Sequence, residues 1–147
     1  MLLFARLVPA LLWMGLIYRS SATPGLRSLP LVQRLGLLPA DLSPGAAQWL
    51  EMLLRKSAHM VAYAILALLL AWALSARWPR RTALRAALVA AVLYAVTDEV
   101  HQSFVPMRAG RLLDVAIDGA GAALGLLLLR PRLPWPGSAS GRPGLQR

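Results

Sequence analysis

The sequence predicts an all-α membrane protein: a compact bundle of four transmembrane helices with a long outer loop between the first and the second. Of its 147 residues, 58% are hydrophobic and 15% are charged, against about 25% charged residues in soluble domains. The mean hydropathy of +0.57 in so short a chain indicates that much apolar surface faces lipid. A net charge of +10 on such an apolar chain does not indicate a disordered or nucleic-acid-binding protein.

Four stretches are suited to crossing a bilayer, whose core of about 30 Å needs about 20 apolar residues in a helix. They are residues 2–18, 58–76, 82–100 and 112–129. The first contains Arg6 and the bulky pair Trp13-Met14 and lacks a clean cleavage site of small residues. We therefore expect a retained anchor, with a cleaved signal peptide as the alternative.

Two segments lie outside the predicted spans. Residues 19–49 hold four prolines and three glycines and predict an outer loop or lid, in which the apolar residues 29–38 could lie along the membrane surface. Residues 131–147 are rich in Pro, Gly, Ser and Arg, which predicts a disordered, basic cytoplasmic tail. Residues 1–130 then form one transmembrane domain.

The distribution of charge predicts the orientation. If the spans alternate, the N-terminus, residues 77–85 and the tail share one side, which holds nine of the 16 basic residues and none of the six acids. Basic residues near span ends are retained in the cytoplasm. We therefore expect both termini inside, in a bacterial cytoplasmic (inner) membrane.

Polar side chains gather at the span ends that alternation brings to the outer face. Those predicted to contact a ligand are Lys56, His59, Asp98, Glu99, His101, Gln102, Arg108, Asp114 and Asp118. Within each span they recur at helical spacings of three or four residues, so each helix can offer one polar stripe to the others. The sequence therefore predicts an outward-facing polar pocket. The alternative is that the charges at span ends simply extend to the membrane interface.

Two features of the last two spans bear on this pocket. Asp114 and Asp118 lie inside the fourth span, where an unpaired carboxylate costs several kcal/mol, and a deep acid also leaves a proton-coupled carrier as a third possibility. Gly121 and Gly125, together with the alanines of the third span, permit close approach of the helix backbones. The alternative is that these small residues reflect the composition of the genome.

Residues 98–110, DEVHQSFVPMRAG, followed by Asp114 and Gly125, resemble the signature of the VanZ-like family of small bacterial membrane proteins. Residues 55–59 (RKSAH) are similar to the Lys-x-x-His segment of that family, and residues 13–18 (WMGLIY) to its first span. The resemblance covers residues 10–130 and implies a cell-envelope protein of the type linked to resistance to the glycopeptide antibiotic teicoplanin. Met107 and Asp118 depart from the pattern, which has a small residue and an amide there.

The first functional hypothesis is binding without catalysis. The pocket would bind an anionic lipid or an element of a peptidoglycan precursor or glycopeptide, through Lys56, Arg108 and the positive N-terminal ends of the second and fourth spans. Asp98, Asp114 and Gln102 would orient the two cations. Membrane lipids are then the expected partners, and an oligomer is compatible with this hypothesis.

The alternative is a membrane-embedded hydrolase or transferase that acts on a lipid-linked phosphate. His59 or His101 would be the acid–base group, oriented by Asp98 or Glu99. The same four residues would be the ligands of a metal, but Asp-Glu-x-His-Gln is not an established ligand spacing, and no metal is expected. The chain has no cysteine and no recognisable coenzyme-binding loop, so no cofactor is predicted.

Overall fold

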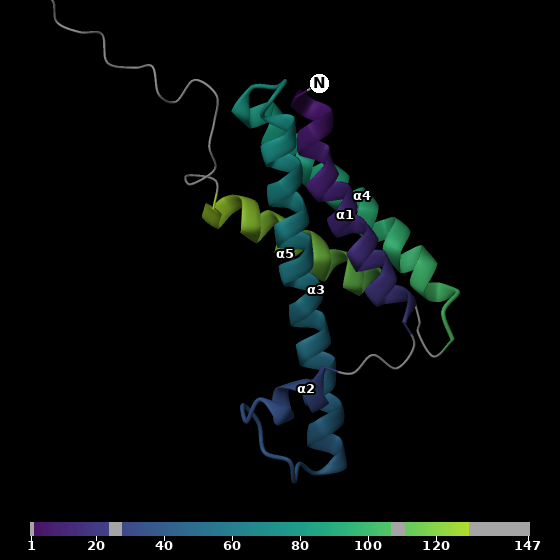
Figure 1. Ribbon diagram of the computed structural model, residues 1–147. Helices are drawn as coiled ribbons and strands as arrows, with labels where there is room; N and C mark the ends of the chain where they lie inside the picture. Colours follow the sequence, from purple (N-terminus) through teal and green to yellow (C-terminus); the bar gives the residue numbers. More distant parts are fainter. Residues whose placement is uncertain (1, 24–27, 107–110, 130–147) are drawn as a thin grey trace, which may run out of the picture.

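A computed structural model describes residues 2–23, 28–106 and 111–129, and within these ranges every regular element is a helix. The elements are α1 (Leu2–Ala22), α2 (Leu29–Arg34), α3 (Pro44–Leu74), α4 (Arg80–Ser103) and α5 (Leu112–Leu129) (Figure 1). The prediction of an all-α chain is confirmed, and each predicted span overlaps α1, α3, α4 or α5. Arg108 and the predicted tail, residues 131–147, lie outside the described residues.

The helices expose far more apolar surface than a water-soluble domain of this size tolerates. Phe4 on α1 is 75% exposed and Leu112 on α5 is 88% exposed, and further large apolar side chains are exposed along α1, α4 and α5. Among the described helices, α1 and α3 are long and apolar enough to cross a membrane. These features are typical of a membrane protein.

Side-chain contacts show that α1 and α3 run in opposite directions. Near the start of α1, Arg6 donates a hydrogen bond to Ser75 Oγ, just beyond the end of α3, at 3.2 Å. Further along α1, Trp13 Nε1 donates to the carbonyl oxygen of Ala62 at 2.8 Å. The N-terminus and the turn between α3 and α4 consequently lie at the same end of the bundle (Figure 1).

Helix α4 runs in the same direction as α1. The Tyr94 hydroxyl donates to the carbonyl oxygen of Met14 at 2.7 Å, and seven residues further along α1 Ser21 contacts Asp98. One face of α4 consists of alanines at intervals of four residues, all fully buried: Ala83, Ala87, Ala91 and Ala95. Helices α1, α3 and α4 therefore alternate in direction, and small residues form the buried face of α4.

Helix α5 crosses α3 obliquely and at close range (Figure 1). A Cβ atom added at Gly121 would lie 2.3 Å from the carbonyl oxygen of Met60, and one at Gly125 would lie 2.8 Å from the Cβ of Ala64. No real side chain tolerates such distances, so glycine is required at the crossing. The predicted close approach at Gly121 and Gly125 is confirmed.

The prediction of one long loop over residues 19–49 is wrong. Helix α1 continues to Ala22, and α3 begins at Pro44, well before residue 58, where the second span was predicted to start. Ser43 caps α3, because its Oγ accepts a hydrogen bond from the N–H of Ala46 at 3.4 Å, and Pro44 occupies the first turn, where no donor is needed. The Pro44-Gly45 pair therefore starts a helix, where its composition suggested a loop.

The short helix α2 is anchored to the first half of α3. Both carboxylate oxygens of Glu51 accept backbone N–H groups at 2.7 Å, one from Ser28 and the other from Leu29. The helix ends at Arg34, and Gly36 two residues later has a φ of 69°, a left-handed conformation that favours glycine. As a result, α2 lies beside the part of α3 that precedes Lys56.

Candidate functional site

A cavity of about 350 Å³ lies where α3, α4 and α5 meet. The residues that line it are Met52, Arg55, Lys56, His59, Glu99, Gln102, Arg111, Asp114, Ile117 and Asp118. Eight of these ten side chains are charged or polar, which is unusual within so apolar a bundle. Such residues inside membrane helices are costly and generally mark a functional site.

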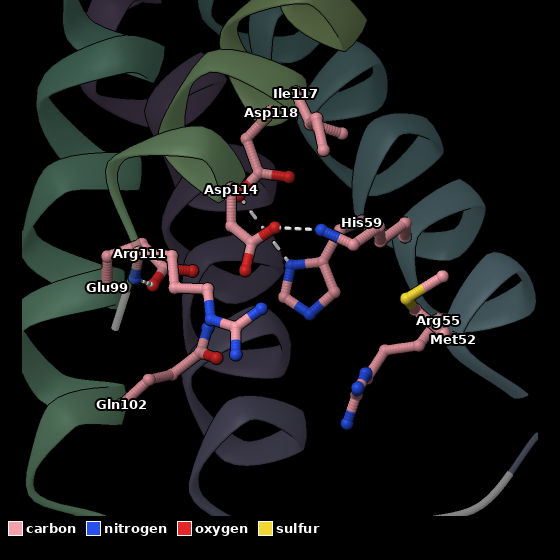
Figure 2. A pocket seen from close by; sticks show the side chains of 10 residues that line it. Met52, Arg55, His59, Glu99, Gln102, Arg111, Asp114, Ile117 and Asp118 are labelled. Atoms are coloured by element: carbon pink, nitrogen blue, oxygen red, sulfur yellow. Dashed lines mark hydrogen bonds and ion pairs between the residues drawn. The ribbon is translucent and has the colours of Figure 1, made fainter. Parts of the chain in front are cut away.

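Two pairs of oppositely charged groups connect α3 to α5 across the cavity. Lys56 Nζ forms an ion pair with Asp114 Oδ1, and the two side chains are 27% and 29% exposed. One turn further into the bundle, His59 Nδ1 lies 3.7 Å from Asp118 Oδ2, and the Asp118 side chain is only 2% exposed. Figure 2 shows Asp114 and Asp118 extending from α5 toward His59.

Helix α4 closes the cavity with Glu99 and Gln102, which are both buried. Glu99 Oε2 accepts a hydrogen bond from the backbone N–H of Arg111 at 2.8 Å. This bond satisfies one of the free N–H groups at the start of α5 and places a carboxylate near the positive end of that helix. Glu99 thereby fixes how the chain enters α5.

Two arginine side chains lie at the open side of the cavity. Figure 2 shows the Arg55 side chain extending away from His59 and Asp118, and the Arg111 guanidinium lying on the side of the cavity nearer Gln102. Both residues are exposed, and neither guanidinium forms an ion pair within the described ranges. Within the described ranges, Lys56 and Asp114 are thus paired across the cavity, whereas Arg55 and Arg111 at its edge form no ion pair.

The VanZ/LLP1 family profile matches residues 6–133, which is most of the chain and includes every residue that lines the cavity. The chain belongs to the VanZ/LLP1 family. The predicted family resemblance is therefore confirmed. Neither the curated proteins nor the solved structures contain a match to this chain.

The structure brings together most of the residues that the sequence analysis assigned to a pocket in this VanZ/LLP1 protein. Those lining the cavity are Lys56, His59, Glu99, Gln102, Asp114 and Asp118. Asp98 and His101 do not line it, and Arg108 lies outside the described residues. The role of Arg108 in anion binding therefore stays a prediction.

Asp98 belongs instead to a buried polar cluster between α1 and α4. It is 2% exposed, and its Oδ2 accepts hydrogen bonds from Ser21 Oγ at 2.9 Å and from Gln102 Nε2 at 3.1 Å. Its Oδ1 is buried without a hydrogen-bond partner among the described residues, as is the hydroxyl of Tyr63. Gln102 contacts this cluster and also lines the cavity, so it connects the two.

His101 also faces α1. Its ring stacks on Tyr18 with the ring centroids 4.2 Å apart. Asp98 and Glu99 are consecutive residues of one helix and so point in directions about 100° apart, which is why one contacts α1 and the other the cavity. Sequence spacing placed Asp98, His101 and Gln102 on one stripe but did not show that α1 covers most of it.

The expected contribution of the α3 helix end to anion binding is wrong. Because α3 begins at Pro44, Lys56 and His59 lie in its interior, several turns from its N-terminal N–H groups. The field of a helix terminus acts mainly within the first turn. Only α5, which begins at Leu112, presents its N-terminus beside the cavity.

Arg55 and Arg111 line the cavity but were not among the residues predicted to contact a ligand. A signal for both was present, because Arg55 lies four residues before His59, and Arg111 three before Asp114 and seven before Asp118. These spacings place each arginine on the same helix face as a predicted site residue.

The chemistry available in the cavity is acid–base and ionic. No three His, Cys, Asp or Glu side chains in the described part of the chain are arranged to hold a metal ion. His59 beside the buried Asp118 is the arrangement of an oriented imidazole, which could accept or donate a proton. The lining residues that the structure describes include no Ser, Thr or Cys that could act as a nucleophile.

Proposed function

We propose that this VanZ/LLP1 protein is a multi-pass protein of the bacterial inner membrane, crossing it with α1, α3, α4 and α5. Two of these helices, α1 and α3, have the length and composition of spans. The alternating directions of α1, α3 and α4 support a bundle that crosses the membrane four times. Both termini would then lie in the cytoplasm. The cavity, at the ends of α1 and α4 and the start of α5, would open to the outer face.

The cavity would bind the phosphate or carboxylate group of a membrane-associated amphiphile. The single observation that carries this proposal is that Arg55 and Arg111 border the cavity without ion-pair partners in the described residues, whereas Lys56 and His59 face carboxylates of α5. A guanidinium binds phosphate or carboxylate through two parallel hydrogen bonds. An anionic lipid and an element of a peptidoglycan precursor or glycopeptide both carry such groups.

A second candidate function rests on the pair formed by His59 and Asp118. A histidine held by a buried carboxylate at a cavity wall is suited to activating water, and the guanidinium groups would neutralise the charge that develops on a phosphate. The protein would then hydrolyse or transfer a lipid-linked phosphate. Turnover of such a substrate in proteoliposomes, lost in His59→Ala and retained in His101→Ala, is the result that this second function requires.

The binding proposal is tested with the full-length protein in nanodiscs. Bound phosphatidylglycerol is displaced by a competing lipid, and the fraction that stays bound is measured. This fraction is compared between the wild type and the double variant Arg55→Ala, Arg111→Ala. We expect affinity to fall about tenfold or more, because one hydrogen bond to a charged group contributes about 1.5–3 kcal/mol. Arg81→Ala, which changes an exposed arginine at the far end of α4, is the matched control.

Unchanged affinity in the double variant, with the control also unchanged, would contradict the binding proposal.

The orientation is tested separately, since the chain has no cysteine and single-cysteine variants are therefore specific. Gln48→Cys should react with an impermeant maleimide from outside intact cells, and Arg81→Cys only after the membrane is permeabilised. The reverse pattern would contradict the proposed orientation.

A further inference from the structure

A second hollow adjoins the cavity. It is a groove of about 920 Å³ between α2 and the first turns of α3. Its lining includes Leu29 and Pro30 from α2 and Ala47 and Trp49 from α3. Met52, Arg55 and Arg111 line both hollows. The guanidinium groups of Arg55 and Arg111, which have no ion-pair partner in the described part of the chain, therefore lie at the junction of a polar cavity and a larger, partly apolar groove.

Charge changes sign from this junction to the floor of the cavity. Arg111 directly precedes α5, and Asp114 and Asp118 follow it at intervals of three and four residues, so the three residues lie on one side over an axial rise of about 10 Å. Asp114 is already paired with Lys56. The cavity is thus cationic at the junction and acidic at its floor.

Asp118 at this floor has an unfilled hydrogen-bonding position. It is 1% exposed, and its Oδ2 has no hydrogen-bond partner in the described ranges, since the His59 nitrogen at 3.7 Å is beyond hydrogen-bond distance. A buried carboxylate oxygen without a donor is destabilising. A donor group on a ligand in the cavity would relieve this cost.

Among the described residues that line the cavity, the charges are balanced. With the histidine neutral, three basic side chains face three carboxylates: Arg55, Lys56, Arg111, Glu99, Asp114 and Asp118. A ligand that carries only an anion would leave excess negative charge inside an apolar helix bundle, which is less favourable than a balanced set of charges. A ligand that carries one negative and one positive group keeps the balance.

We infer that the ligand is a zwitterionic amphiphile. Its acidic group lies between Arg55 and Arg111, its primary amine donates to Asp118 and Glu99, and its apolar part extends from the junction along the groove beside α2. Phosphatidylethanolamine is the simplest membrane lipid with these three features. The inference rests on the proposed anion binding at the two arginines and adds the amine and the groove.

The test uses full-length protein in nanodiscs and lipids with identical acyl chains. The lipids compete for the binding site, and the affinity is measured for each of them: phosphatidylethanolamine, its N-methylated derivatives, phosphatidylcholine and phosphatidylglycerol. In the wild type, affinity should fall stepwise as methyl groups replace N–H donors, by about tenfold in total, and phosphatidylethanolamine should bind more tightly than phosphatidylglycerol. Water-soluble glycerophosphoethanolamine should compete at least tenfold less well, because it cannot occupy the groove.

Variants separate this inference from the proposed function. Asp118→Asn should remove the dependence on methylation while phosphatidylglycerol still binds, and Glu99→Gln is a second variant in case the first does not fold. Asp41→Asn, an exposed acid that lines neither hollow, is the control. The double variant Arg55→Ala, Arg111→Ala should lose all of these lipids.

Three results would count against the inference. If the wild type binds methylated and unmethylated lipids equally, or if Asp118→Asn and Glu99→Gln keep the methylation dependence, the amine site is refuted while anion binding at the arginines stands. If the soluble head group competes as well as the lipid, the groove has no role. If the arginine double variant binds every lipid like the wild type, the proposed function fails as well.

Discussion

The cavity between α3, α4 and α5 and the cluster around Asp98 contain similar residues but differ in how their charges are satisfied. In the cavity, Lys56 and His59 face carboxylates, and the ion pair of Lys56 with Asp114 keeps more than a quarter of each side chain exposed. Around Asp98, the neutral donors Ser21 and Gln102 contact the carboxylate, which is buried. The cavity is therefore built to exchange partners, whereas the Asp98 cluster is built to hold α1 against α4.

The largest effect is expected from a variant that separates the helices around the cavity. Gly121→Ala places a Cβ atom 2.3 Å from a backbone oxygen of α3, which cannot be relieved by moving a side chain. We expect a loss of about 3 kcal/mol or more of stability, at the upper end of the cost of overpacking, and loss of lipid binding. Thermal unfolding in detergent measures the first and the nanodisc assay the second.

Gly15→Ala on α1 is the matched control, because an added Cβ there meets nothing within 4 Å. It should leave stability unchanged or raise it slightly, since alanine favours a helix more than glycine does. Equal unfolding temperatures for the two variants would show that α5 does not approach α3 as closely as described.

The second prediction contrasts the two regions directly. Asp98→Ala removes the acceptor of two buried donors, Ser21 Oγ and Gln102 Nε2, and should cost about 2 kcal/mol. Asp98→Asn keeps an acceptor oxygen and should recover most of that loss. Asp114→Ala, in the partly exposed cavity, should cost about 1 kcal/mol or less, because Lys56 can still reach water. Unfolding temperatures of the three variants in one detergent give the comparison.

If Asp114→Ala is as destabilising as Asp98→Ala, the distinction between an open site and a closed structural cluster is wrong. If Asp98→Asn is as destabilising as Asp98→Ala, the acceptor role assigned to Asp98 Oδ2 is wrong, and the charge of the carboxylate itself matters.

Much of this arrangement could be predicted from the sequence, because apolar length and small-residue spacing are local properties. The long apolar helices, the alanine stripe of α4 and the glycines at the α3–α5 crossing follow from them. The start of α3 at Pro44 could not be predicted from composition, because a proline in a first turn and one in a loop look alike until the Ser43 cap is seen.

The sequence could predict which residues of the candidate site share a helix face, but not which neighbouring helix covers that face. Glu99 and Asp98 differ by one position, and only the packing of α1 against α4 decides that Glu99 faces the cavity. The availability of Arg55 and Arg111 could not be predicted either, since it depends on which carboxylates are already paired. Pairing is a property of the assembled bundle.

The third prediction distinguishes the two histidines. His101→Ala removes a ring stacked on Tyr18 and should lower stability by about 1 kcal/mol without changing lipid affinity. His59→Ala should change lipid affinity or turnover, because His59 lines the cavity. Unfolding temperature and the competition assay are measured on both variants. An effect of His101→Ala on affinity as large as that of His59→Ala would mean that the cavity extends to α1.

The smallest expected effect concerns the ion pair between Lys56 and Asp114, and it sharpens the comparison by measuring how much the open region contributes to stability. A double-mutant cycle with Lys56→Met and Asp114→Asn should give a coupling of about 0.5–1 kcal/mol, since both side chains are partly exposed and such pairs are weak. The corresponding cycle with Ser21→Ala and Asp98→Ala should give a larger coupling, because that hydrogen bond is buried. If the ion pair is the stronger of the two, its main role is to join α3 to α5, and Lys56 is then unavailable to a ligand even when Arg55 and Arg111 bind one.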